Sequence, residues 1–103
     1  MPRRKRAALR LLRPAEEDLT EIYDYIAADN PSAAERLLLR MERGLNTLAK
    51  QPMSGPVPRD PDIAQLGYRY LIIGEYLIFY KIDGSQIFVH RILHGSRDYS
   101  EIL

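Results

Sequence analysis

The last third of the chain contains three short apolar runs joined by two-residue links, and this pattern constrains the fold more than any other feature. The runs are YRYLII, YLIFYKI and QIFVHRIL, and the links are Gly74-Glu75 and Asp83-Gly84. Runs of this length that are rich in Ile, Val, Tyr and Phe are typical of strands, and a two-residue link with glycine is typical of a tight hairpin. The sequence therefore predicts a three-stranded antiparallel meander.

Two segments before the meander carry apolar residues at helical spacing. The first helix is expected to begin near Pro14, and Asn30 is expected to cap the second. The two apolar stripes are Leu19, Ile22, Tyr23 and Ile26, then Ala34, Leu37, Leu38, Met41, Leu45 and Leu48. A short strand at residues 8–12 precedes them, and the proline-rich stretch 51–65 is expected to be a loop. The predicted class is α+β in the order β-α-α-β-β-β.

Composition limits the class of protein. At 103 residues the chain has room for one domain, residues 1–103, and its apolar runs are too short to cross a membrane. Cysteine is absent, so a cytoplasmic protein without disulfides is expected. The net charge of +1 does not demand nucleic acid, although Arg3, Arg4, Lys5 and Arg6 crowd the N-terminus ahead of an acidic stretch.

Two-residue turns would give the meander two different faces. One face is expected to take the helices and to contain Leu71, Ile73, Ile78, Ile87, Val89 and Leu93. The other is aromatic and edged with polar groups, with Phe79 opposite Phe88, and contains Tyr70, Ile72, Leu77, Phe79, Phe88, His90 and Ile92. A contiguous apolar patch usually marks a partner surface. This interpretation is preferred to the alternative that the N-terminal arm and the proline loop fold over the patch.

Few residues suggest chemistry. Two histidines without metal-ligand spacing, and glycines that stand alone, predict neither a metal site nor a phosphate loop, and no cofactor is expected. His94, Ser96 and Asp98 include the residue types of a hydrolase triad, but neighbours at a strand end rarely converge on one atom. A structural corner is the preferred interpretation of this segment.

The strings EDLTEIYDYIA, LGYRYLIIGEYLIFYKI and RILHGSRDY, in this order, resemble the RelE/ParE toxin superfamily and lie nearer its ParE branch. The resemblance runs from about Leu11 to Leu103. It implies the toxin of a type II toxin–antitoxin pair, with a ParD-like antitoxin of the ribbon-helix-helix class as cognate partner. The aromatic face would then bind the antitoxin. Operator DNA would be contacted only through the antitoxin.

The resemblance also implies two competing mechanisms. RelE-like members cleave messenger RNA on the ribosome with a basic cluster and a tyrosine, and Leu77 stands here where that cluster has an arginine. Lys81, Arg97 and Tyr99 could still serve a metal-free endoribonuclease. ParE-like members inhibit DNA gyrase without a known catalytic residue, and this is the first expectation, with His94, Arg97 and Tyr99 as target contacts. A third possibility is a non-toxic co-repressor that acts with the antitoxin on its own operon.

Overall fold

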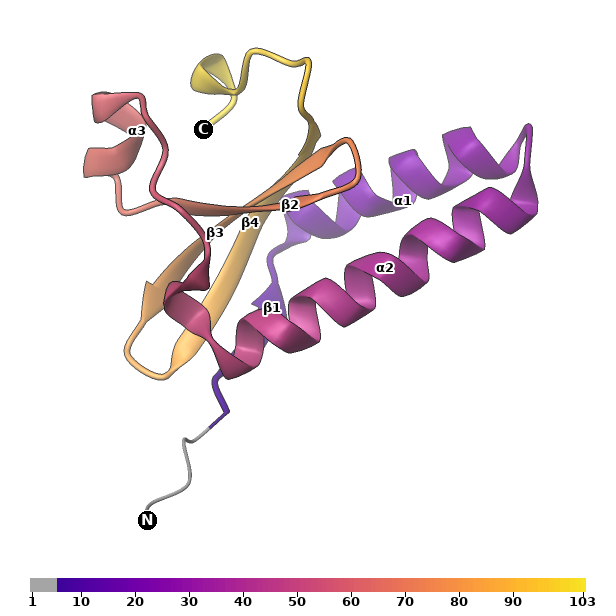
Figure 1. Cartoon of the computed structure of the whole chain (residues 1–103). Coiled ribbons are helices and arrows are strands. Elements are labelled where there is room, and N and C mark those ends of the chain that lie inside the picture. The colour runs from indigo at the N-terminus through magenta and orange to yellow at the C-terminus, as the bar shows by residue number, and fades with distance from the viewer. Residues whose placement is uncertain (1–5) are drawn as a thin grey trace.

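The computed structural model describes residues 6–103 and shows a helical hairpin packed on one face of a four-stranded sheet (Figure 1). Arg3, Arg4 and Lys5 of the N-terminal basic cluster lie outside these residues. The predicted α+β class and the β-α-α-β-β-β order of its main elements are confirmed. The elements are β1 (Ala8–Leu11), α1 (Arg13–Ala27), α2 (Pro31–Lys50), the 3₁₀ turn η1 (Pro52–Ser54), α3 (Pro61–Gln65), β2 (Arg69–Ile73), β3 (Tyr76–Asp83), β4 (Gln86–His94) and the 3₁₀ turn η2 (Tyr99–Glu101).

The helical hairpin begins and turns where the sequence predicts. Leu12 leaves β1 with its N–H still donating to the Val89 carbonyl at 2.9 Å, and α1 starts at the next residue. Asn30 caps α2, since its side-chain oxygen accepts the Ala33 N–H at 3.1 Å. Within residues 6–103 no helix is both long and apolar enough to span a membrane.

The sheet has the strand order β1-β4-β3-β2, with β1 parallel to β4 and the other pairs antiparallel. The parallel pairing follows from the helical hairpin, which carries the chain back across the sheet before the meander begins. The main core lies between the sheet and the two helices. Its buried members are Ala15, Met41, Leu48, Ile73, Ile78, Tyr80, Ile87, Val89 and Ile92.

The second hairpin departs from the predicted register. Asp83 pairs with Gln86, so the link is Gly84-Ser85, and Gly84 adopts a positive φ of 59° that favours glycine. A two-residue shift leaves the faces unchanged, so Ile87 and Val89 point toward the helices as expected. Tyr80, instead of Ile78, lies opposite Val89.

A bulge at His90 then exchanges the two faces for the rest of β4. Tyr80 pairs with Val89 but Phe79 pairs with Arg91, so His90 is an extra residue. Ile92 therefore lies in the core under the helices, and the prediction that it belongs to the aromatic face is wrong. Leu93 moves the other way, to the face that carries Phe79.

Part of the aromatic face is covered by the chain itself. Phe79, which does not lie opposite Phe88, is only 1% exposed. It belongs to a second cluster of buried residues, which are Ile63, Tyr68, Phe79 and Leu93. The partly buried residues that pack against this cluster are Tyr70, Leu77, Tyr99, Ile102 and Leu103. The cover comes from α3 and the C-terminal segment, which stand over the sheet on the side away from the helices (Figure 1). The expectation that this whole face is open is therefore wrong.

The cover also shows that residues 51–65 are not simply a loop. Asp60 caps α3 by accepting the Asp62 N–H at 2.9 Å, and Ile63 of α3 is buried. The stretch is tied to the sheet by the buried Tyr80 hydroxyl, which donates to the Pro52 carbonyl at 2.8 Å and accepts the Gly55 N–H at 3.0 Å.

Candidate functional site

The end of β4 forms a corner organised by His94. The Ser96 N–H donates to His94 Nδ1 at 3.1 Å, so the ring proton of the neutral imidazole belongs on Nε2, which lies 3.4 Å from a Glu75 oxygen. The Ser96 hydroxyl lies 2.7 Å from Nδ1, and the Tyr76 ring meets the imidazole edge-on at 5.5 Å between centroids. The side chains therefore brace the turn that follows the strand.

These contacts do not make a hydrolytic site. A serine and a carboxylate on the two nitrogens of one imidazole are the residue types of a triad. However, Nδ1 already accepts a backbone N–H, and the Glu75 side chain is 81% exposed at a long contact distance. Asp98, the acid considered from sequence, instead accepts the Ser100 N–H and caps η2. The side-chain contacts at this corner hold the turn that follows β4.

Arg97 and Tyr99 follow the corner but face different surroundings. Arg97 is exposed and lines a hollow of about 350 Å³ between α1 and the end of the sheet. Tyr99 turns inward, and its ring centroid lies 5.0 Å from that of Phe79 in the second cluster. Of the three predicted target contacts, His94 and Arg97 therefore line the same hollow, whereas the Tyr99 ring packs on the face of the sheet away from the helices.

Lys81 lies on the side of the sheet away from the helices. Its ammonium sits 4.4 Å from the centre of the Tyr68 ring. No hydrogen bond or ion pair among residues 6–103 joins Lys81 to Arg97 or to Tyr99. Leu77, at the position where a ribonuclease would have an arginine, packs against the second cluster. Lys81 and Tyr99 therefore both lie around the second cluster, whereas Arg97 borders the hollow next to α1.

The uncovered part of the aromatic face is a row across three strands. Phe88 of β4 lies between Arg10 of β1 and Lys81 of β3, and all three side chains are half-buried or exposed. His90 adjoins the row, with its ring edge-on to Tyr68 at 5.3 Å. Burial, and then the Lys81 charge, lower the pKa of His90. This part of the face combines an aromatic ring with positive charge.

Ile72 marks the other open part of the same face. It is 61% exposed on the edge strand β2, next to the half-buried Tyr70. Of the seven residues predicted to bind a partner on this face, Tyr70, Ile72, Leu77, Phe88 and His90 retain some exposure, whereas Phe79 and Ile92 are buried.

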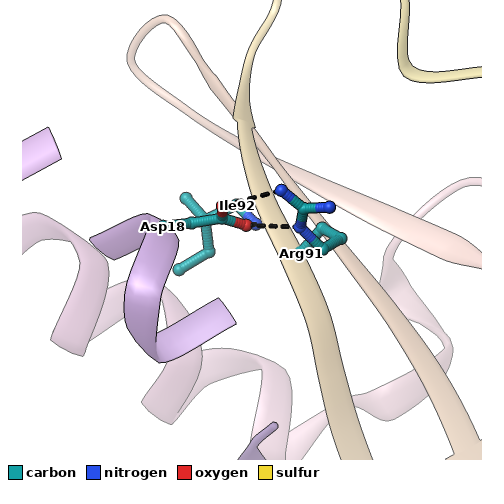
Figure 2. Close-up of polar contacts among 3 residues, drawn as sticks. All are labelled: Asp18, Arg91 and Ile92. Atoms are coloured by element: carbon teal, nitrogen blue, oxygen red, sulfur yellow. Dashed lines mark hydrogen bonds and ion pairs between the residues drawn. The ribbon is translucent and has the colours of Figure 1, made fainter. Parts of the chain in front are cut away.

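Asp18 and Arg91 form a partly buried ion pair that the sequence analysis did not predict (Figure 2). Arg91 donates through Nε and Nη2 to the two carboxylate oxygens at 2.7 and 2.8 Å. The same carboxylate accepts the Ile92 N–H at 2.9 Å. Strand β1 pairs with β4 only as far as Val89, so Asp18 of α1 supplies the acceptor that the missing strand would have provided.

The pair fixes α1 against the end of β4. Hydrogen bonding to Asp18 raises the pKa of the Arg91 guanidinium, and the nearby Glu21 and Glu17 charges add to this. Asp18 and Ile92 also line the hollow that Arg97 borders. In the described part of the chain, no three His, Asp or Glu side chains gather as a metal site would require.

Comparison with known proteins gives consistent matches. A family model described as the ParE toxin of the type II toxin–antitoxin system parDE matches residues 9–99. Toxin RelE2 of Caulobacter vibrioides is 33% identical over 81 residues, covering 78% of this chain and 85% of that protein.

Two solved structures share the fold. A chain of the chromosomal ParDE TA system from P. aeruginosa matches with a TM-score of 0.70 and 22% identity, covering 85% of this chain and 95% of that chain. A chain of the toxin–antitoxin complex RelBE2 from Mycobacterium tuberculosis matches with a TM-score of 0.62 and 20% identity, covering 87% and 99%. Both structures match at least 85% of this chain, so they support the same fold over most of its length.

Proposed function

Because the chain belongs to the ParE toxin family of type II toxin–antitoxin systems, we propose that it poisons DNA gyrase by protein contact, without catalysing a reaction. His94 and Arg97, at the end of the sheet, contact the target. The protein acts in the cytoplasm and needs no cofactor. A cognate antitoxin neutralises it.

The observation that supports a non-catalytic mode is that Arg97 lies apart from Lys81 and Tyr99, and that Leu77 stands where a ribonuclease would have an arginine. Lys81 lies over Tyr68, Tyr99 packs on Phe79, and Arg97 lines the hollow beside α1. Metal-free RNA cleavage needs a base, an acid and a cation around one phosphate. A protein inhibitor needs only an exposed surface, which Arg97 and its neighbours provide.

The antitoxin occupies the uncovered parts of the face away from the helices. Phe88 supplies an aromatic anchor flanked by two cations, and Ile72 supplies an exposed aliphatic one. An antitoxin segment that is acidic and apolar complements both. Its ribbon-helix-helix part would then contact operator DNA.

A supercoiling assay with purified gyrase tests the target contact. Arg97→Ala is expected to raise the toxin concentration for half-inhibition about tenfold, as loss of a central charged contact does. Arg59→Ala, which removes another exposed arginine from the proline-rich stretch, is the matched control and should leave inhibition unchanged. Equal inhibition by both variants would exclude Arg97 from the contact, and no inhibition by the wild type would exclude gyrase.

The similarity to Toxin RelE2 favours one second candidate, a ribosome-dependent endoribonuclease. In that case Lys81, Arg97 and Tyr99 would carry the cleavage, and alanine at any of them would abolish it while antitoxin binding remained. The co-repressor alternative differs from both, since expression of the toxin alone would then leave growth unaffected.

A further inference from the structure

Tyr25 is the most exposed large apolar side chain among residues 6–103. It projects from α1 with 84% of its surface accessible and borders two hollows, one at the tip of the helical hairpin and the other at the end of the sheet. The second hollow is the one that Arg97 borders. Its walls come from α1, β3, β4 and the segment after β4: Asp18, Glu21, Ile22, Tyr25, Tyr76, Ile92, His94 and Arg97.

Charges of both signs surround this hollow: acidic side chains lie on α1, and Arg97 stands in the wall. Glu17, Glu21 and Asp24 are all exposed on α1, and Glu21 lies in the wall itself. Partial burial, followed by the Glu75 charge and by Tyr25, raises the pKa of the Tyr76 hydroxyl. Asp18 is already satisfied by Arg91 and by the Ile92 N–H, so Glu21 is the wall carboxylate left to meet a ligand.

Two tyrosine rings and a carboxylate in one hollow have the chemistry that binds an organic cation. A guanidinium gains from lying over an aromatic face, and it pairs with a carboxylate through two parallel hydrogen bonds. We propose that the hollow receives an arginine side chain of the target protein, held by Tyr25, Tyr76 and Glu21. The identity of that target rests on the proposed function, whereas the ligand chemistry does not.

The target is favoured over the antitoxin as the source of this arginine. His94 and Arg97 lie on the same hollow, so the surface is continuous with the proposed target contact. The antitoxin surface, built around Phe88 and Ile72, lies on the opposite side of the sheet from the helices.

A titration with a small probe tests the ligand chemistry without gyrase. N-acetyl-arginine amide, followed by NMR at the Tyr25 and Tyr76 resonances, should bind about fivefold or more tightly than the citrulline analogue, which is neutral but of similar shape. Glu21→Gln should remove this preference, whereas Glu42→Gln, an exposed carboxylate on α2, should keep it. Arg97→Ala should tighten binding, because it removes a positive charge from the wall. Absent binding, equal binding of both probes, or equal effects of the two glutamine variants would overturn the proposal.

A second experiment identifies the source. Tyr25→Ala should raise the half-inhibitory toxin concentration for gyrase about tenfold. Its melting temperature and antitoxin affinity should remain those of the wild type, because the side chain is mostly exposed. Leu39→Ala, a half-exposed residue on α2, is the control and should match the wild type in all three measurements. Unchanged inhibition by Tyr25→Ala, or a loss confined to antitoxin binding, would overturn the assignment to the target. A wild-type protein that does not inhibit gyrase would refute the proposed function, while the probe titration would still decide the ligand chemistry.

Discussion

Replacing Asp18 by alanine is expected to destabilise the fold by about 3 kcal/mol. Asp18 is 9% exposed, and its carboxylate accepts three hydrogen bonds, two from Arg91 and one from the Ile92 N–H. An orphaned buried N–H costs roughly 1–3 kcal/mol, and removal of one partner from a buried ion pair costs roughly 3–5 kcal/mol. Because the Arg91 side chain remains 25% exposed, its guanidinium can regain some water, so the expected cost of about 3 kcal/mol lies below the simple sum of these two ranges.

Urea unfolding at neutral pH measures this loss, with Glu17→Ala as the matched control. Glu17 pairs with Arg13 on the same helix, but both side chains are mostly exposed, so its loss should cost about 0.5 kcal/mol or less. The double variant Asp18→Ala/Arg91→Ala should lose less stability than the two single variants added together. An Asp18→Ala protein within about 0.5 kcal/mol of the wild type would refute the role assigned to the pair.

Three further predictions concern the sheet. Phe79→Ala should cost about 3 kcal/mol of stability because its ring is buried, whereas Phe88→Ala should mainly weaken antitoxin binding; thermal unfolding and antitoxin titration of both variants check this contrast. Tyr80→Phe should cost about 2 kcal/mol in urea unfolding, since two backbone groups of the proline-rich stretch lose their partner. The pKa of His90 is lowered in the folded protein, so as the pH falls the His90 side chain takes up its proton at a higher pH in the unfolded chain than in the folded one. The free energy of unfolding should therefore decline below about pH 6.5. This decline should be smaller in His90→Gln, and a variant that loses as much stability between about pH 7.5 and 5.5 would refute the assignment.

The predictable parts of the fold depended on local signals. Asn30-Pro31 carries a cap and a helix start in adjacent residues, and the link at Gly74-Glu75 fixes the first hairpin, where Ile73 pairs with Tyr76 as expected. The α3 helix had a comparable signal in Asp60-Pro61, which was outweighed by the high proline content around it.

The bulge at His90 could not be derived in the same way. The run QIFVHRIL has apolar residues that could face the helices with or without a bulge. The bulged register is the one in which Asp18 of α1 accepts the Ile92 N–H. Asp18 and Arg91 are 73 residues apart, and no local pattern pairs them. Because Ile92 and the cover over Phe79 both depend on such long-range contacts, the predicted partner surface included two residues that are buried.

We propose that this toxin acts on gyrase by contact and does not cleave RNA. The most direct measurement expresses the toxin without antitoxin and follows two signals in the same culture, incorporation of labelled thymidine and the 5′ ends of cellular messenger RNA. DNA synthesis is expected to stop first while the messages keep their normal ends, and Arg97→Ala is expected to restore synthesis. New in-frame message ends that appear before synthesis falls, and that vanish in Tyr99→Phe, would contradict it.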